Sequence, residues 1–239
     1  MPVTLHGRRA DLNLPAAMVE GLSSTLATDE ITRAARFHFE RHRDRFVVAR
    51  GLLRAILGRY LCVEPDQVRF RYGANGKPAL ADEFDSRLHF NLAHSGWLAL
   101  YAITWNREIG IDLECVRSEV SYEDIAGTFF SSGEASALHK LPAADRSRAF
   151  LACWTRKEAY AKAKGVGLGL PLSRCEVSLV PGAPAVLLNT WPDPLDGSRY
   201  FIVDLDPGPG YVAALAVEGD GWRLRSYQVP CIPWFSCPP

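Results

Sequence analysis

Two carboxylates placed two residues apart are the first feature that could do chemistry. Asp112 and Glu114 lie in the segment Gly110-Ile111-Asp112-Leu113-Glu114. On a strand, residues two apart face the same side, so these carboxylates would point together while their apolar neighbours face the core. Paired carboxylates repel each other, and a hard cation such as Mg²⁺, which prefers oxygen ligands, relieves that repulsion. Taken alone, the same pattern also fits a solvated strand end.

A second segment has the spacing of a helix that carries charge on a half-buried face. Trp154, Glu158 and Lys162 recur every four residues and therefore share one helix face. A Glu and a Lys at this spacing commonly form an ordinary surface salt bridge. Trp154 indicates instead that this face is at least half-buried, and a charged pair there needs a further polar partner.

A third segment groups hydrogen-bonding side chains at the end of a predicted strand. Asn91, His94 and Ser95 precede Gly96 and offer donors to a phosphate or amide ligand. A single His in a turn also commonly has a structural role. A Ser-His-Asp hydrolase is not supported, because the sequence has no nucleophile-elbow pattern.

The elements that would position these residues follow from periodicity. Helical spacing extends over residues 28–61 with a break near His42, and Thr28 is the predicted N-cap. Alternation predicts a strand over residues 68–72, followed by a loop at 73–78. Two further apolar runs, residues 98–104 and 109–116, predict a hairpin.

The second half of the chain has a similar plan. Ser121 and Ser131 each precede an acidic residue by three positions, which predicts two capping boxes. A long helix is expected from Pro142 to Lys164, stopped by Gly165. Four strand-like runs come next, at residues 175–180, 200–205, 211–217 and 222–229.

An internal similarity links the halves. Residues 96–103 resemble residues 210–217 in type and order, and each has a long predicted helix upstream. The similarity predicts a duplicated α+β unit, with residues 1–117 and 118–239 as two halves around a pseudo-two-fold axis. The cleft between them would be the natural ligand site. Chance similarity among strand-forming residues is the alternative.

Composition excludes several classes of protein. The chain has 27 basic and 27 acidic residues among 239, so no net charge favours nucleic acid, and the basic run at residues 41–45 lacks a stacking aromatic motif. No apolar run reaches the about 18 residues of a membrane span, and no secretory signal is expected, which indicates a cytoplasmic protein. Six scattered cysteines predict reduced thiols and not a zinc site. The glycines at 165–169 follow a helix, which is the wrong context for a dinucleotide loop.

In their order along the chain these segments resemble the Sfp-type 4′-phosphopantetheinyl transferases. That family shows a Gly-Lys-Pro loop, an Asn-x-Ser-His-Ser turn, Gly-x-Asp-x-Glu, and Trp-x-x-Lys-Glu-Ala/Ser with a Lys four residues beyond the Glu. Here the corresponding segments are residues 76–78, 91–95, 110–114 and 154–162. The resemblance covers residues 30–180, and less distinctly the rest. Ala93 departs from the pattern, because the family usually has Ser there.

The resemblance implies a fold and an activity. The fold is α+β, with two similar pseudo-two-fold-related subdomains, each a small antiparallel-rich sheet packed on a long helix. The activity moves the phosphopantetheine arm of coenzyme A to a serine of an apo acyl or peptidyl carrier protein, giving holo carrier and 3′,5′-ADP. It implies Mg²⁺, with Mn²⁺ as a substitute, a role in polyketide or non-ribosomal peptide biosynthesis, a monomer, and no nucleic-acid or membrane partner.

The resemblance also implies roles for single residues. Asp112, Glu114 and Glu158 would hold the metal, Glu158 or its bound water would be the general base, and Lys162 would stabilise the transferring phosphate. Whether Glu158 is base, metal ligand or both stays open. The residues implied to bind coenzyme A are Arg33, Arg45, Lys77, Pro78, His94, Ser95, Asp112 and Lys162.

The two arginines at positions 33 and 45 come from a cationic stretch. Residues 28–61 contain eight arginines against four acids, an excess that suits a phosphate. Most of the other arginines are expected on solvated helix faces. Glu134 is expected to cap a helix and is left outside the site.

Other classes of function use the same residues. A non-catalytic coenzyme A or carrier-docking protein would keep the fold, and another Mg²⁺-dependent phosphotransferase or nucleotide hydrolase would keep the acids. The presence of all three carboxylates and of Lys162 favours a transferase. Which carrier protein is modified has no short sequence signature.

Overall fold

The computed structural model describes residues 3–84, 87–117, 122–179 and 184–229. Its elements up to residue 117 are β1 (Val3–Asp11), α1 (Ala16–Ser23), α2 (Thr28–Ala34), α3 (Glu40–Leu61), a 3₁₀ turn (Pro65–Gln67), β2 (Phe70–Tyr72), β3 (Pro78–Leu80), β4 (Leu88–Ser95), β5 (Leu98–Trp105) and β6 (Ile109–Cys115). The elements from residue 122 are α4 (Tyr122–Phe129), α5 (Ser132–Lys140), α6 (Ala143–Lys164), two 3₁₀ turns (Gly167–Gly169 and Leu172–Arg174), β7 (Glu176–Val177), β8 (Leu187–Asn189), α7 (Asp196–Arg199), β9 (Tyr200–Leu205), β10 (Tyr211–Glu218) and β11 (Trp222–Gln228).

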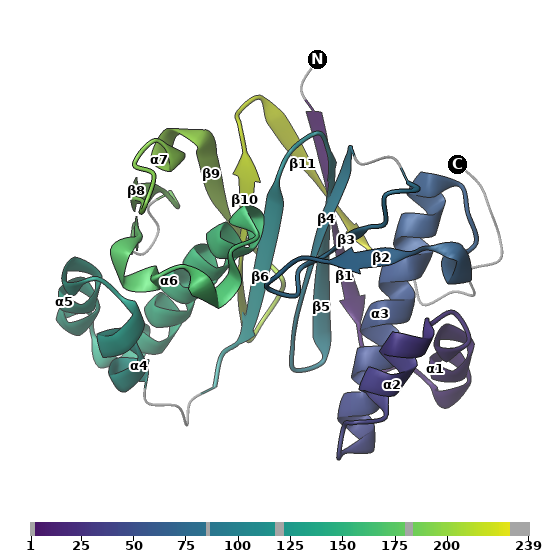
Figure 1. The fold of residues 1–239 in the computed structure, drawn as a ribbon. Coiled ribbons are helices and arrows are strands. Elements are labelled where there is room, and N and C mark those ends of the chain that lie inside the picture. The colour runs from purple at the N-terminus through teal and green to yellow at the C-terminus, as the bar shows by residue number, and fades with distance from the viewer. Residues whose placement is uncertain (1–2, 85–86, 118–121, 180–183, 230–239) are drawn as a thin grey trace.

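Two sheets lie between two long helices (Figure 1). One sheet has the strand order β11-β1-β5-β4, and the other has the order β6-β10-β9. Helix α3 covers the outer face of the first sheet and α6 that of the second, each through its own apolar cluster. A third cluster fills the space between the sheets. This arrangement confirms the predicted α+β fold, in which small antiparallel-rich sheets pack on long helices.

The two similar segments found in the sequence form the central strands, β5 and β10. In β5, Leu98 faces the layer between the sheets. Its counterpart in the sequence match, Val212 of β10, faces α6 instead. Because side chains alternate along a strand, a match that is one residue out of step exchanges the two faces. The strands are therefore equivalent in position, whereas the literal pairing of their residues does not hold, and duplication stays a prediction.

The predicted hairpin between β5 and β6 is wrong. Both edges of β5 are already paired, with β1 on one side and β4 on the other. Strand β6 instead pairs antiparallel with β10 in the second sheet. A side chain links β6 to the first sheet, because Asn91 Oδ1 on β4 accepts a hydrogen bond from Ile111 N at 2.8 Å.

The helix predictions hold with small shifts at the ends. The break in residues 28–61 lies between Ala34 and Glu40, just before the predicted position. The N-cap of α2 is Ala27 and not Thr28, and the Glu30 carboxylate accepts a hydrogen bond from Ala27 N at 3.0 Å.

The second long helix matches its prediction, since α6 ends at Lys164 and Gly165 caps it with a φ of 70°. The Ser131 capping box is confirmed by two hydrogen bonds with Glu134. The predicted Ser121 box lies outside the described residues. The four strand-like runs correspond to β7, β9, β10 and β11, whereas β1, β8 and α1 were not predicted.

Strands that are far apart in the sequence meet in each sheet. β1 pairs in parallel with β11, and β6 pairs with β10. Each sheet thus contains strands from both sides of residue 117, and the division into 1–117 and 118–239 stays a prediction. Across the described ranges, no helix is both long and apolar enough to cross a membrane.

One glycine sets how closely the second sheet approaches its helix. A Cβ atom at Gly110 of β6 would lie 2.0 Å from Ala159 O and 2.3 Å from Ala163 N of α6. Such distances are far below van der Waals contact, so only glycine allows the strand and the helix backbone to touch here. The contact places the residues after Gly110 directly beside the last turns of α6.

We predict that Gly110→Ala moves β6 away from α6. The added methyl group meets backbone atoms, which cannot rotate aside, so the free energy of unfolding should fall by about 2 kcal/mol or more. Urea unfolding followed by circular dichroism measures this change. The matched control is Gly21→Ala on α1, where a Cβ meets nothing within 4 Å. Equal stability of the Gly110→Ala variant and the wild type would show that the contact is not tight.

Candidate active site

The acidic strand and the charged helix face meet where Gly110 allows close packing. Lys162 Nζ of α6 lies 2.6 Å from Asp112 Oδ1 of β6 and also donates to Ile111 O at 3.3 Å. Asp112 is only 6% exposed, and Glu114 and Glu158 are half-buried. The predicted carboxylates therefore come together with Lys162 in one place.

The negative charges of the three carboxylates repel one another, and this repulsion affects their pKa values. Burial is the largest cause that raises the pKa of each one above its ordinary value. The charge of Asp112 further raises the pKa values of Glu114 and Glu158, while Lys162 lowers all three. One ammonium group thus faces three acids, which leaves excess negative charge in the cluster.

Two oxygen atoms of this cluster have no hydrogen bond. Asp112 Oδ2 and Glu158 Oε1 are buried without a partner among the described residues. Buried polar atoms are nearly always paired, and an unpaired one needs an explanation such as a ligand or an ion. Carboxylate oxygens are the donors that Mg²⁺ prefers, so the chemistry of the donor set fits this ion.

The three carboxylates do not form a complete metal-binding geometry with their side chains in these positions. Across the described part of the chain, no three Asp, Glu, His or Cys side chains are arranged to hold a metal ion. Lys162 bonds one oxygen of Asp112, and Ser95 Oγ donates to Glu114 Oε2 at 2.9 Å. The assignment of Asp112, Glu114 and Glu158 to one ion stays a prediction.

Strand β4 fixes the orientation of the acidic strand. Ser95 Oγ accepts from Cys115 N at 3.1 Å while it donates to Glu114, so it ties the end of β4 to the end of β6. Ala93, at the position where the family usually has Ser, is 4% exposed and packs in the apolar layer between the sheets. An apolar side chain suits that position.

His94 lies on the face of β4 opposite Ala93 and remains accessible to solvent. Its pKa is lowered, first by reduced hydration and then by the charges of Lys162 and Arg33. These two cations come from different halves of the chain. His94 is therefore within electrostatic reach of both Lys162 and Arg33.

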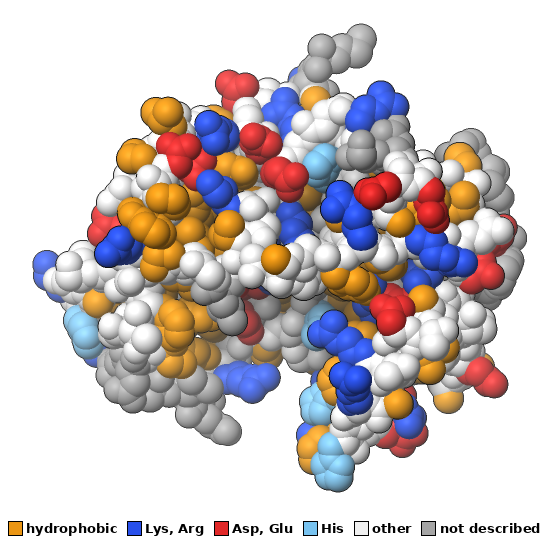
Figure 2. Space-filling model, viewed as in Figure 1, with side chains coloured by type: hydrophobic (Ala, Val, Ile, Leu, Met, Phe, Trp, Pro, Cys, Tyr) orange, Lys and Arg blue, Asp and Glu red, His pale blue; other side chains and the backbone are white. Residues whose placement is uncertain are grey.

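A hollow separates the part of the molecule around α6 from the part around α3 (Figure 2). Acidic side chains are visible inside it, and His, Lys and Arg side chains line the wall on the α3 side. Such a wall can bind an anion while the acids hold a cation.

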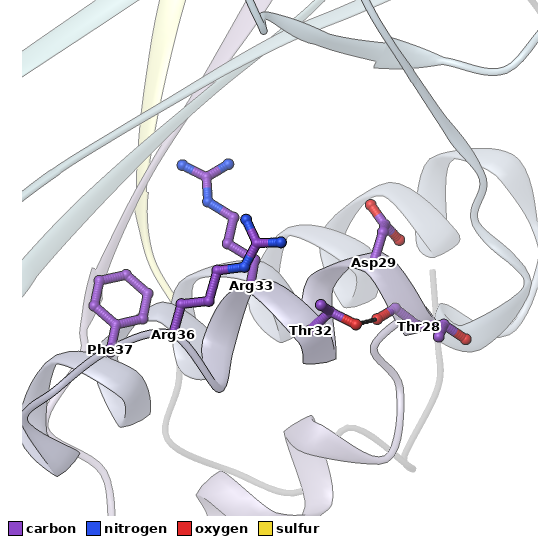
Figure 3. A pocket seen from close by; sticks show the side chains of 6 residues that line it. All are labelled: Thr28, Asp29, Thr32, Arg33, Arg36 and Phe37. Atoms are coloured by element: carbon purple, nitrogen blue, oxygen red, sulfur yellow. Dashed lines mark hydrogen bonds between the residues drawn. The ribbon is translucent and has the colours of Figure 1, made fainter.

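The two predicted phosphate-binding arginines come from neighbouring helices, Arg33 from α2 and Arg45 from α3. Arg33 of α2 lines an open pocket with Arg36 and Phe37, which follow that helix (Figure 3). The Arg33 guanidinium lies 5.4 Å from the centre of the Phe46 ring. Arg45 Nε donates to Asn13 Oδ1 at 2.9 Å.

The ammonium group of Lys77 is occupied by contacts within the protein. Its ammonium group donates to Glu108 Oε2 at 3.2 Å, and to Ile109 O and Ala163 O at 3.3 Å each. These acceptors come from the start of β6 and the end of α6, so Lys77 joins the strand to the helix. Pro78 begins β3 and pairs with Tyr72 of β2. A role in coenzyme binding for either residue stays a prediction.

Several buried charges are structural. Lys157, next to Glu158 in sequence, is fully buried and pairs with Glu134 at 2.5 Å. Glu134 also accepts from Val177 N at 2.8 Å, which agrees with leaving it outside the site. The expected solvated face is wrong for Arg50 and Arg54, which are 7% and 1% exposed.

Two residues fix the acidic strand without having been predicted to do so. Gly110 was assigned only to a motif, and Asn91 only to a set of ligand donors. The signal for Gly110 was its place before two carboxylates that must meet a helix.

Comparison with known proteins gives a consistent result along the chain. Residues 16–105 match the family model described as 4′-phosphopantetheinyl transferase, N-terminal. Residues 108–216 match the model described as 4′-phosphopantetheinyl transferase superfamily.

Relatives of similar length carry the same description. The 4′-phosphopantetheinyl transferase HetI of Nostoc sp. is 44% identical over 94% of this chain and 92% of its own. A putative 4′-phosphopantetheinyl transferase of Synechocystis sp. is 35% identical over 92% and 91%. The 4′-phosphopantetheinyl transferase Sfp of Bacillus subtilis is 29% identical over 88% and 90%.

We predict that Glu158→Gln stabilises the protein at pH 7 without divalent cations. The pKa of Glu158 is raised by burial and by its acidic neighbours, so its charged form is disfavoured in the fold and a neutral amide removes that cost. Urea unfolding measures the gain, which should vanish as the pH falls to the ordinary pKa of 4.5.

Glu40→Gln is the matched control for this measurement, because the Glu40 side chain is 78% exposed. It should leave the free energy of unfolding within about 0.5 kcal/mol of the wild type. A Glu158→Gln variant less stable than the wild type at pH 7 would contradict the description of a repulsive cluster.

Proposed function

Because the chain belongs to the 4′-phosphopantetheinyl transferase family, we propose that it moves the 4′-phosphopantetheine arm of coenzyme A to a serine of an apo carrier protein. The products would be the holo carrier and 3′,5′-ADP, and the carrier an acyl or peptidyl carrier domain. The family resemblance expected from the sequence is confirmed, and the protein is a transferase. Substrate, metal and residue roles beyond this are the proposal.

The observation that carries the proposal is the meeting of β6 and α6. Asp112 and Glu114 come from the strand, Glu158 and Lys162 from the helix, and the Asp112 to Lys162 contact at 2.6 Å joins them. Attack of a serine hydroxyl group on a diphosphate needs positive charge beside the phosphate oxygens and an acceptor for the hydroxyl proton. This cluster supplies both, as the Lys162 ammonium group and the Glu158 carboxylate.

Glu158 is the proposed proton acceptor. The serine oxygen of the carrier attacks the phosphorus that bears pantetheine, and its proton passes to the Glu158 carboxylate or to a water that Glu158 holds. The bond from this phosphorus to the leaving 3′,5′-ADP oxygen breaks as the new bond forms. The raised pKa of Glu158 makes it a stronger base than an ordinary glutamate.

We assign to Lys162 the stabilisation of negative charge on the phosphate group that is transferred. Lys162 lies on the same helix face as Glu158 and one turn beyond it. An ammonium group there stabilises phosphate oxygens as the bond to 3′,5′-ADP breaks. The same group pairs with Asp112 in the structure, so it is held at the cluster by a carboxylate.

Asp112, Glu114 and Glu158 are the proposed ligands of Mg²⁺, or of Mn²⁺ in its place. When bound, the ion would neutralise diphosphate charge and polarise the phosphoryl group. The support is the unpaired oxygens of Asp112 and Glu158. Glu158 as metal ligand and Glu158 as base are both compatible with its position.

The remaining proposed contacts bind the nucleotide end of coenzyme A. Arg33 and Arg45 would hold the 3′-phosphate, since guanidinium groups match phosphate oxygens. His94 and Ser95 would contact the diphosphate, since Ser95 already bonds Glu114 of the cluster. Lys77 and Pro78 would shape the wall beside the end of α6.

The wider setting belongs to the same proposal. A monomer in the cytoplasm, acting in polyketide or non-ribosomal peptide biosynthesis, fits the two-sheet plan within one chain and the activity class. The alternatives are a docking protein that binds coenzyme A without transfer, and a phosphotransferase or hydrolase with another substrate.

The decisive experiment incubates the protein with an apo carrier, coenzyme A and Mg²⁺. The carrier should gain the mass of one phosphopantetheine group, measured by intact-protein mass spectrometry. Coenzyme A binding with no mass gain across a panel of acyl and peptidyl carriers would favour the docking protein, and release of phosphate without carrier modification would favour a hydrolase.

Asp112→Ala is predicted to lower the transfer rate by at least about 100-fold. The substitution removes a carboxylate of the cluster and the partner of Lys162. Initial rates at several Mg²⁺ concentrations measure the effect, with Glu40→Gln as the control. Near-normal turnover with unchanged Mg²⁺ dependence would show that the metal site lies elsewhere.

A further inference from the structure

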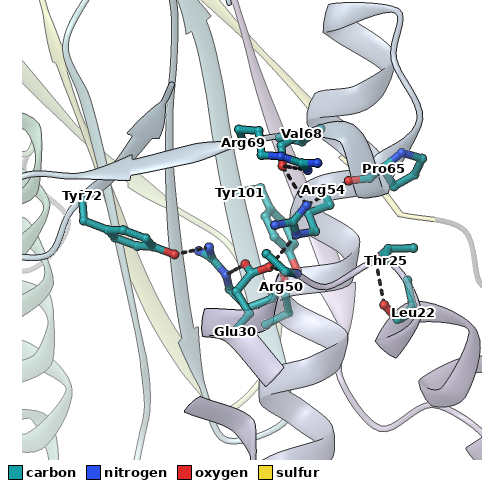
Figure 4. A network of polar contacts seen from close by, with 12 residues as sticks. Leu22, Thr25, Glu30, Arg50, Arg54, Pro65, Val68, Arg69, Tyr72 and Tyr101 are labelled. Carbon is teal, nitrogen blue, oxygen red and sulfur yellow. Dashed lines mark hydrogen bonds and ion pairs between the residues drawn. The ribbon is translucent and has the colours of Figure 1, made fainter. Parts of the chain in front are cut away.

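A buried carboxylate far along the chain from the acids on β6 and α6 is held by two arginines (Figure 4). Glu30 of α2 is 2% exposed. Its Oε1 accepts from Arg50 Nε at 2.5 Å, and its Oε2 accepts from Arg54 Nε at 2.6 Å. Both arginines belong to α3. The carboxylate therefore joins the short helix α2 to the long helix α3.

The arginines are themselves fixed at their other ends. Arg54 donates to Pro65 O at 3.1 Å and to Val68 O at 2.8 Å. Arg50 donates to the hydroxyl group of Tyr72 at 2.8 Å and lies 4.7 Å from the centre of the Phe70 ring. The cluster thus has a fixed geometry set by α3, the turn after it and β2.

Helix α2 has little else to hold it. It has seven residues, and only Glu30 and Ala34 among them are buried. Ile31, its large apolar residue, is 50% exposed. A helix this short gains little from its own hydrogen bonds and depends on tertiary contacts for its place. Glu30 is therefore its main anchor.

The turn of α2 that contains Glu30 also carries Arg33, an arginine of the open pocket. Arg33 is three residues after Glu30 and projects with Arg36 into that pocket (Figure 3). Neither arginine has an ion-pair partner among the described residues. The orientation of α2 on α3 consequently decides where the Arg33 guanidinium group stands relative to His94 and the hollow.

We propose that Glu30 is a positioning residue, which locks α2 on α3 through Arg50 and Arg54 so that Arg33 faces the 3′-phosphate of coenzyme A. The inference rests on the proposed function, in which coenzyme A is the substrate and Arg33 contacts that phosphate. Glu30 itself touches no substrate. It sets the discrimination between coenzyme A and dephospho-coenzyme A by placing another side chain.

Positioning and simple electrostatics predict opposite results for Glu30→Gln. The substitution removes one negative charge near the phosphate site, so electrostatics alone predicts tighter binding of coenzyme A. Loss of the anchor predicts weaker binding, because two buried guanidinium groups lose their carboxylate and α2 shifts. The sign of the change separates the two explanations.

The experiment measures binding of coenzyme A and of dephospho-coenzyme A by calorimetry for the wild type, Glu30→Gln, Arg33→Ala and the double variant. Glu30→Gln should weaken coenzyme A roughly tenfold and dephospho-coenzyme A less than about twofold. The double variant should bind coenzyme A no more weakly than Arg33→Ala, because both changes remove one interaction. The transfer rate at saturating coenzyme A should stay within about twofold of the wild type.

Glu40→Gln is the matched control, with the same chemical change at an exposed position on α3. Should Glu30→Gln fail to fold, Tyr72→Phe removes only the hydroxyl group that Arg50 contacts. Tyr72→Phe should weaken coenzyme A binding less than Glu30→Gln does, and it should still weaken coenzyme A more than dephospho-coenzyme A. Circular dichroism establishes that each variant is folded before binding is measured.

Equal weakening of both ligands, unchanged binding or tighter binding in Glu30→Gln would overturn the positioning role. If Arg33→Ala weakens both ligands equally, Arg33 is not at the 3′-phosphate and the positioning role falls with it. Phosphopantetheine transfer by the wild type is measured in the same preparation. Its presence or absence tests the proposed function separately from the role of Glu30.

Discussion

The contact between the backbones of β6 and α6 is the constraint on which the rest of the structure depends. Gly110 removes the Cβ atom that would separate them. Asp112 and Glu114 then face the helix turns that carry Glu158 and Lys162. Charges are expensive to bury, and here three acids share one ammonium group. The fold maintains this unfavourable arrangement with the apolar layers on both sides of the second sheet.

Buried charge has two different uses in this protein. In Lys157 with Glu134, and in Glu30 with its two arginines, every charge has a partner and the ion pairs join neighbouring elements. In the carboxylate cluster, two oxygen atoms stay without a partner among the described residues. Arg8 Nε and Thr104 Oγ1 are also buried without a partner among the described residues, but only the carboxylate cluster combines unpaired atoms with several acids.

The sequence allowed the site residues to be predicted more accurately than the order of the strands in the sheets. Spacing alone placed Asp112 with Glu114 and Glu158 with Lys162, because strand and helix periods are local. The pairing of β6 with β10 could not be read from the sequence, since strands adjacent in the chain form a hairpin by default and only the occupied edges of β5 prevent it. Glu30 was missed for the same reason, because both its arginine partners are twenty or more residues away.

Diffraction from crystals soaked with Mn²⁺ and coenzyme A, recorded at the manganese absorption edge, tests the central claim most directly. The account predicts one strong anomalous peak with carboxylate oxygens of Asp112 and Glu114, from the strand, and of Glu158, from the helix, within about 2.5 Å, and with the coenzyme diphosphate on the same ion. A peak bound by residues of only one of these two elements, or placed outside the hollow between the halves, would contradict it.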